Sequence, residues 1–208
     1  MKLNEITSPS LTKDQLDWLK AMGITNYSVN ANGLIDVNSD VDISFKKLTS
    51  IPVQFGHVSG FFYCNNNNLT SLQGAPQSVS GDFFCYRNNL TSLQGAPQIV
   101  SGDFSCSGNN LPSLQGAPQI VSGDFFCSGN NLTSLHNIHK QIKSIKGSFI
   151  CDNKIKSHIL GLLLIRDLKK LEGIREVEHI INKHLIDKDV HLCQEDLIEA
   201  GFAEMGKL

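Results

Sequence analysis

The sequence predicts an α/β solenoid, a fold in which coils of equal length stack along one axis. The first observation is a motif with a period of 21 residues, whose copies begin at Leu48, Leu69, Leu90, Leu111 and Leu132. The second is that three consecutive copies are nearly identical and contain no insertion. They read LTSLQGAPQSVSGDFFCYRNN, LTSLQGAPQIVSGDFSCSGNN and LPSLQGAPQIVSGDFFCSGNN. Close self-similarity at a fixed short period is the signature of stacked structural repeats.

The spacing of apolar residues inside each copy identifies the type of coil. It matches the leucine-rich-repeat core L-x-L-x-x-N-x-L-x-x-L at Phe83, Cys85, Asn88, Leu90 and Leu93. We therefore expect one short strand per coil and a parallel sheet along one face of the solenoid. The return arc Gln-Gly-Ala-Pro-Gln contains proline and no helical period, which predicts an extended or polyproline-like back face.

Two columns of polar or reactive residues follow the same period. The cysteines Cys64, Cys85, Cys106, Cys127 and Cys151 take the inward strand position, so we interpret them as core residues and not as a metal site or disulfides. The asparagines Asn67, Asn88, Asn109 and Asn130 follow the strand. A ladder of buried amides can bond the backbones of adjacent coils, so these side chains are also predicted to be structural.

The chain divides into three predicted regions: residues 1–40 form an N-terminal cap, 41–154 the solenoid and 155–208 a C-terminal helical module. In the first region a helix over residues 12–22 begins with the capping box of Thr12 and Gln15. A hairpin follows around Asn32-Gly33. In the third region we expect helices over residues 158–167, 175–185 and 189–200, which either cover the last coil or bind a partner of their own.

The fifth copy departs from the pattern, because its glycine, Gly147, arrives three residues late. Its longer arc is basic and contains His136-x-x-His139, which could form half of a zinc site beside Cys151. Cys151 should point inward and no second close ligand pair is visible, so no metal site is predicted.

Composition limits the kinds of partner. The net charge is −2, and residues 60–135 carry only Asp82, Arg87, Asp103 and Asp124 as charged side chains. This argues against nucleic acid and against an anionic membrane surface. The N-terminus lacks the apolar core of an export signal, no segment is long enough to span a bilayer, and the packed cysteines suit a reducing compartment. We therefore expect a cytoplasmic protein.

The sequence gives no sign of an enzyme or of a cofactor. It contains no nucleophile with its base, no paired carboxylates and no phosphate-binding loop, since the recurring glycines lack a following Lys-Ser or Lys-Thr. A binding role is favoured, because solenoids present extended surfaces to other proteins.

Nearly the full chain resembles leucine-rich-repeat proteins encoded by large tailed bacteriophages. The resemblance is carried by the stretch 51–58, IPVQFGHV, by the LTSLQGAPQ repeats, by residues 155–165, IKSHILGLLLI, and by residues 193–200, CQEDLIEA. It implies expression in the cytoplasm of an infected bacterium, and it carries no assigned activity. Certain bacterial effectors join similar repeats to a ubiquitin-ligase domain, but that domain is much larger than the C-terminal module here.

The outward strand positions form the predicted binding site. One row contains Tyr63, Phe84, Ser105, Phe126 and Ile150. A second row contains Asp82, Asp103 and Asp124, and Tyr86 and Arg87 lie at the other end of the strand. Large apolar side chains facing out of a core mark an interaction surface. Three stacked aspartates repel one another unless a basic group offsets them. We expect a protein segment with an apolar anchor flanked by Lys or Arg.

Three alternatives remain open at this point. In the first, the chain's own helical module covers the aromatic row. In the second, a second copy of the chain covers it in a homo-oligomer. In the third, the protein is a structural component of a phage particle.

Overall fold

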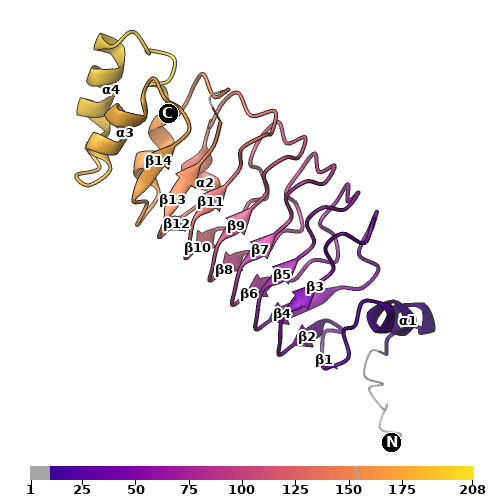
Figure 1. Ribbon diagram of the computed structural model, residues 1–208. Helices are drawn as coiled ribbons and strands as arrows, with labels where there is room; N and C mark the ends of the chain where they lie inside the picture. The colour runs from indigo at the N-terminus through magenta and orange to yellow at the C-terminus, as the bar shows by residue number, and fades with distance from the viewer. Residues whose placement is uncertain (1–9, 153) are drawn as a thin grey trace, which may run out of the picture.

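The computed structural model describes residues 10–152 and 154–208 and shows an elongated parallel β-solenoid (Figure 1). Residues 1–9 of the predicted N-terminal cap and Asn153 of the predicted solenoid lie outside the described residues. The coils advance by 21 residues from one to the next, as Phe62, Phe83, Phe104 and Phe125 pair in register. The repeated coils carry strands and no helix, so the helical share of the predicted α/β solenoid is confined to the ends and to one irregular coil.

Two sheets of seven strands run along the solenoid, where the sequence predicted one sheet and an extended back face. Sheet A contains β1 (Tyr27–Val29), β2 (Ile35–Val37), β4 (Phe55–Val58), β6 (Ser78–Val79), β8 (Ile99–Val100), β10 (Ile120–Val121) and β12 (Ser144–Ile145). Sheet B contains β3 (Val41–Asp42), β5 (Phe62–Tyr63), β7 (Phe83–Phe84), β9 (Phe104–Ser105), β11 (Phe125–Phe126), β13 (Ser148–Ile150) and β14 (Lys170–Glu172).

Sheet A exists because the end of the return arc is buried. Val79, Val100 and Val121 point into the core and are at most 1% exposed. Once equivalent residues stack at about 4.8 Å, their buried N–H and C=O groups must pair, and the neighbouring coil is the nearest partner. The β-branched Ile-Val pair before Ser-Gly-Asp is the sequence signal for this second strand. The Gln-Gly-Ala-Pro segment is a turn and not the predicted extended arc, since Gly74, Gly95 and Gly116 have φ of 95°, 89° and 86° and the N–H of Ala75 donates to the carbonyl of Leu72 at 3.0 Å.

A Ser-Gly-Asp corner joins the two sheets, and its glycine permits close stacking. Gly102 donates its N–H to the carbonyl of Gly81 at 3.0 Å, and Gly123 repeats the bond to Gly102 at 2.9 Å. A Cβ added at Gly102 would lie 2.8 Å from the carbonyl carbon of Gly81. The backbone there has an ordinary negative φ. Glycine is therefore required by the close approach of the preceding coil and not by a sharp turn, which was the sequence-based reason for it.

The predicted asparagine ladder is confirmed. Asn109 is 5% exposed, and its Oδ1 accepts the N–H of Leu90 at 3.0 Å. Its Nδ2 donates to the carbonyls of Cys85 at 3.1 Å and Cys106 at 2.9 Å. Asn88 and Asn130 repeat these three bonds one coil earlier and one coil later. Each amide therefore joins two consecutive coils at the end of sheet B.

Replacing Asn109 by alanine should lower the free energy of unfolding by about 1–3 kcal/mol, because buried backbone groups of two coils lose their partners. Asn110→Ala is the matched control, since Asn110 is the exposed neighbour. Urea unfolding measures both. Equal midpoints for the two variants would contradict the ladder's role.

The N-terminal helix and hairpin form as predicted. Helix α1 (Lys13–Ala21) has Thr12 as its N-cap, with the complete capping box to Gln15. The Nε2 of Gln15 donates to the carbonyl of Pro52 at 3.1 Å, which fixes the helix on the arc of the following coil. The hairpin strands β1 and β2 pair antiparallel, and β2 pairs parallel with β4. The hairpin therefore forms the first edge of sheet A.

The irregular coil contains the three additional residues seen in the sequence. Phe125 pairs with Phe149, a step of 24 residues, and helix α2 (Ile138–Gln141) replaces the Gly-Ala-Pro arc. Gly147 still donates to the carbonyl of Gly123 at 3.0 Å. The insertion is therefore absorbed on the arc, and both sheets keep their register.

The C-terminal region differs from the prediction in its first part. The expected helix over residues 158–167 is a short 3₁₀ helix, η1 (Leu160–Leu164), and β14 then joins sheet B beside β13. The stack of coils therefore continues past residue 154. The apolar residues of 159–165 are inward-facing parts of a last coil, apart from the exposed Leu164, which explains their lack of helical period. The other two helices are α3 (Glu178–His184) and α4 (Val190–Glu199).

Asn182 of α3 closes the last edge of sheet B. Its Oδ1 accepts the N–H of Leu171 at 2.7 Å, and its Nδ2 donates to the carbonyl of Leu171 at 3.0 Å. One side-chain amide thus gives β14 the two bonds that a further strand would give it. This satisfies the edge, which otherwise could pair with another chain.

Asn182→Ala should destabilise the protein by about 1–3 kcal/mol and expose the amide of Leu171. Hydrogen exchange measured at that amide should accelerate, while His179→Ala, an exposed position on the same helix, should leave it unchanged. Equal protection of Leu171 in both variants would show that Asn182 does not hold the edge.

Candidate binding surface

The predicted site residues lie on the outward side of sheet B. Strand pairing places Tyr63, Phe84, Ser105, Phe126 and Ile150 in one row, one residue from each of five consecutive coils. Asp82, Asp103 and Asp124 precede these strands, and Tyr86 and Arg87 follow β7. We call the outward side chains of residues 61–63, 82–86, 103–107 and 124–128 the sheet-B face.

The aromatic rings of the sheet-B face pack on one another. Tyr63 and Phe84 stack with ring centroids 4.7 Å apart and planes within 4°, and Phe61 stacks on Tyr63 at 4.0 Å. Phe84 also lies 5.9 Å from Tyr86. These rings are half-buried. In Figure 1 the helices α3 and α4 lie beyond β14 at the end of the stack and not over β7–β11, so neighbouring rings account for this burial.

Each aspartate of the sheet-B face has a structural role that the sequence did not reveal. Asp82 Oδ1 accepts the N–H of Asp103 at 2.8 Å, and Asp103 Oδ1 accepts that of Asp124 at 2.8 Å. Asp124 Oδ1 accepts the N–H of Ser148 at 2.7 Å. One oxygen of each carboxylate therefore binds the first amide of the next strand. Because Oδ1 of each aspartate is used within the solenoid, the predicted basic partner would contact Oδ2.

The sheet-B face is acidic, and its negative charge affects the hydroxyl of Tyr63. Its hydroxyl donates to Asp82 Oδ2 at 3.3 Å. Burial raises the pKa of Tyr63, and the negative charges of Asp82, Asp40 and Asp42 raise it further. Among the described residues no Lys or Arg forms an ion pair with Asp82, Asp103 or Asp124. The carboxylates are therefore not neutralised within this part of the chain.

Arg87 does not offset these charges, because it lies at the other end of the strand. It is exposed, it adopts a φ of 53°, and its Cγ lies beside Gly108 of the next coil. Its backbone N–H donates to the carbonyl of Ser107 at 2.8 Å. The predicted site thus has a basic margin at Arg87 and an acidic margin at the aspartates.

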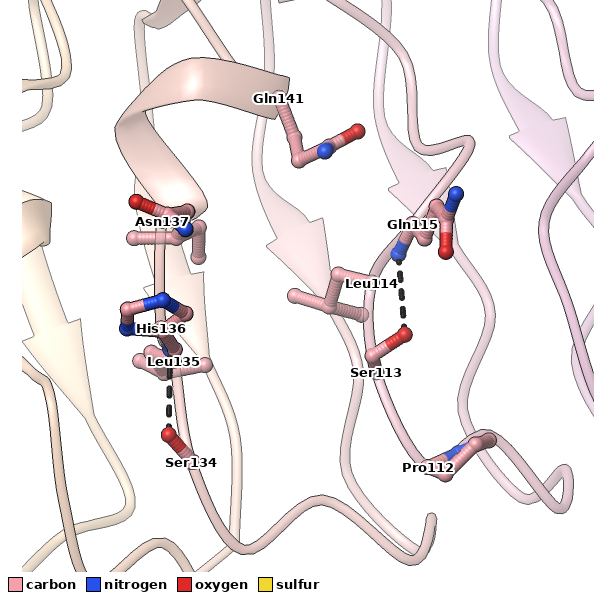
Figure 2. A pocket seen from close by; sticks show the side chains of 10 residues that line it. Pro112, Ser113, Leu114, Gln115, Ser134, Leu135, His136, Asn137 and Gln141 are labelled. Carbon is pink, nitrogen blue, oxygen red and sulfur yellow. Dashed lines mark hydrogen bonds between the residues drawn. The ribbon is translucent and has the colours of Figure 1, made fainter.

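A second concave feature was missed by the sequence reasoning. A cleft of about 300 Å³ lies between the arc at residues 112–115 and the irregular coil, where residues 134–138 and Gln141 form the other wall. Figure 2 shows how the side chains of the two walls face each other. The cleft arises because α2 replaces the regular arc. Its floor includes Leu114 and Leu135, and Ser113, Ser134 and Gln115 supply polar groups. The late glycine was the sequence signal for an irregularity here, but not for its shape.

The histidines near this cleft do not form the suggested zinc half-site. The ring of His136 meets that of His158 edge-on at 4.8 Å, and His158 Nδ1 lies 3.0 Å from the hydroxyl of Ser134. His139 Nδ1 is buried and has no hydrogen-bond partner among the residues that the structure describes. Within residues 10–152 and 154–208 no three His, Cys, Asp or Glu side chains are grouped so that they could hold a metal ion.

One histidine on sheet A contacts two serines. His57 Nδ1 lies 2.8 Å from the hydroxyl of Ser78, and its Nε2 lies 3.3 Å from that of Ser80. In the described part of the chain no carboxylate is bonded to this ring, and both ring nitrogens are occupied by neighbours of the next coil. The 21-residue separation of His57 and Ser78 shows that the contact comes from the stacking of coils.

The cysteines are free and buried, as predicted. Cys85, Cys106 and Cys127 donate weakly from Sγ to carbonyls of the next coil at 3.4–3.5 Å. Burial raises the pKa of every one of these thiols, that of Cys151 to about 12 and that of Cys193 to about 11. The nucleophilic thiolate is therefore suppressed at neutral pH.

Comparison with known proteins gives no match: no family model fits the chain, and neither curated proteins nor solved structures show significant similarity to it. The class of protein that the structure defines is a two-sheet parallel β-solenoid. No helix in residues 10–152 and 154–208 is long and apolar enough to cross a bilayer.

The raised thiol pKa values predict a loss of stability in alkali. A group whose pKa is higher in the folded state contributes stability below its ordinary pKa, about 8.5 for a thiol, and loses it as the pH rises toward the folded value. Cys106→Ala should cost about 1 kcal/mol at pH 7. Its melting temperature should then fall less steeply than that of the wild type between pH 8 and 11. Parallel melting curves across this range would contradict the burial of a neutral thiol.

Proposed function

We propose that the chain is a non-enzymatic protein-binding module that engages its partner through the sheet-B face. The observation that carries this proposal is the row Tyr63, Phe84 and Phe126, large rings that face away from the core. Tyr63 and Phe84 pack on neighbouring rings, and Phe126 has no ring contact among the described residues. Half-exposed aromatic rings in a contiguous group are typical of the centre of protein interfaces, and charged groups are typical of their margins.

The two other faces support binding less well. The outward row of sheet A begins with His57 and continues with the small or aliphatic residues Ser78, Ile99 and Ile120. The arc face carries the cleft of Figure 2, which is concave but suits one or two side chains and not a whole partner. The sheet-B face combines aromatic area, regular spacing and unneutralised charge over four coils.

The narrower assignment rests on the sequence. The repeat phase supports coils of the leucine-rich-repeat class. The contacts Gln15 to Pro52 and Asn182 to Leu171 support a capping role for the N-terminal helix and for α3. The resemblance to phage proteins supports action in the cytoplasm of an infected bacterium on a host protein, for example one of its defence proteins. No cofactor is part of this proposal.

A component of a phage particle or a homo-oligomer is the second candidate. It is favoured by the first edge of sheet B. Among the described residues β3 pairs with a strand on one side only, and Phe45 nearby is 70% exposed. An open edge beside an exposed ring can join a strand of another chain.

The double variant Phe84→Ser/Phe126→Ser tests the proposed function. Serine already occupies this row at Ser105, so the fold should persist and the melting temperature should fall by only a few degrees, at about 2–4 °C per kcal/mol. The tagged variant should lose the host proteins that the wild type enriches from infected cells, as measured by quantitative mass spectrometry.

Ile99→Ser is the matched control, because Ile99 is 45% exposed on sheet A. It should enrich the same proteins as the wild type. Unchanged enrichment by the double variant would contradict the role of the sheet-B face. Co-purification with virions that resists high salt would favour the particle component.

A further inference from the structure

In the row that contains Phe84 and Phe126 on the sheet-B face, one coil carries serine in place of a large side chain. Ser105 in β9 stands between Phe84 in β7 and Phe126 in β11. Equivalent residues two coils apart are separated by about 10 Å. The small side chain therefore leaves a gap between two aromatic rings, and Phe84 is held on its far side by the stack with Tyr63.

The floor of this gap is a polar group without a partner. Ser105 is only 8% exposed, and its inward neighbours Phe104 and Cys106 are fully buried, so its own side chain points outward into the gap. Its Oγ forms no hydrogen bond to any residue that the structure describes, whereas its carbonyl is used by Cys85. This Oγ is not one of the described buried side-chain atoms that lack a partner, so it reaches the surface and is free to bond a group from outside the chain.

The wall of the gap carries negative charge. Asp103 lies two residues before Ser105 on the same side of the strand, about 7 Å away along the chain. Its Oδ1 is used by the N–H of Asp124, and Oδ2 remains as an acceptor. Asp82 and Asp124 stand one coil to either side. Residues 60–135 supply no lysine, and Arg87 lies at the opposite end of the strand.

We propose that this gap, formed by Phe84, Ser105, Phe126 and Asp103, receives one lysine or arginine side chain of the partner protein. A cation midway between the two rings lies about 5 Å from each, within the range of about 6 Å for cation–π attraction. Its N–H groups satisfy the hydroxyl of Ser105, and its charge pairs with the second oxygen of Asp103. The inference rests on the proposed function and specifies the chemistry of the partner.

Two other occupants are less suited to the same gap. A purely apolar side chain would leave the hydroxyl of Ser105 unpaired and would bring no charge to the aspartates. A quaternary ammonium group would suit the rings and the charge, but it has no N–H to donate to Ser105. The enclosed hydroxyl therefore favours a cation that carries hydrogen-bond donors.

The test uses short neutral-backbone peptides with one central residue. Acetylated and amidated Gly-Gly-Lys-Gly-Gly and its arginine counterpart are titrated into the full-length protein, and the ring signals of labelled phenylalanine are followed by NMR. The norleucine peptide is the uncharged probe, because it keeps an unbranched aliphatic side chain and lacks the ammonium group. We expect saturable shifts with lysine or arginine, at least about fivefold weaker binding of norleucine, and weakening with added salt.

Two variants locate the effect. Asp103→Asn keeps an Oδ1 for the N–H of Asp124 and removes only the charge. Ser105→Phe fills the gap with the residue that β7 and β11 already carry, so the fold accommodates it. Each variant should bind the lysine peptide with an affinity at least about fivefold lower than that of the wild type. Asp40→Asn is the matched control: its Oδ1 accepts the N–H of Phe61 at 3.0 Å in the same way, about 14 Å from Asp103.

The outcomes separate this inference from the proposed function. Wild-type affinity in Asp103→Asn or in folded Ser105→Phe would overturn the cation site, as would equal binding of norleucine or a loss of equal size in Asp40→Asn. The proposed function is judged separately, by the partner's response to Phe84→Ser/Phe126→Ser. If that double variant loses the partner while Asp103→Asn and Ser105→Phe retain it, the face binds protein and the cation site is wrong.

Discussion

The structure depends on one constraint, the stacking of each coil on the next at the spacing of a parallel sheet. At the Ser-Gly-Asp corner this spacing leaves no room for a Cβ, and the glycine amide of each coil bonds the glycine carbonyl of the coil before it. The same spacing brings buried polar groups within hydrogen-bond distance of the adjacent coil. The amide of Asn109 and the carboxylate of Asp103 meet that requirement at the two ends of sheet B.

The stacking also decides what the surface can do. Each outward position repeats along the axis. A residue type that recurs at one position therefore forms a continuous row of identical side chains. Phenylalanine gives a ladder of rings, and aspartate gives a ladder of charge in which the first oxygen of each carboxylate is structural. The second oxygen of Asp82 accepts the hydroxyl of Tyr63, and that of Asp103 is free for other contacts. A departure from the row, such as Ser105, is then a local site with walls supplied by the regular coils.

Much of the fold was predictable because the same pattern of residues recurs in several consecutive coils. The period, the inward column of phenylalanine and the asparagine ladder follow from sequence spacing alone. The second sheet was missed because two residues, Ile99 and Val100, carry too little periodicity to separate a strand from an extended arc. The bond from Asp103 to the next coil was missed because an outward aspartate looks like a surface charge. The arrangement of β14 depends on tertiary contacts of Asn182, which no local pattern reveals.

The central claim is that partners bind the sheet-B face, and hydroxyl-radical footprinting of the protein with its partner tests it most directly. The extent of oxidation of Tyr63, Phe84 and Phe126 measures the exposure of this row. The extent of oxidation of Leu164 and Ile99 measures the exposure of other surfaces. The account predicts that the three rings become protected in the complex while the two aliphatic side chains do not change. Protection of Ile99 or of residues around the cleft in Figure 2, with the three rings unaffected, would contradict it.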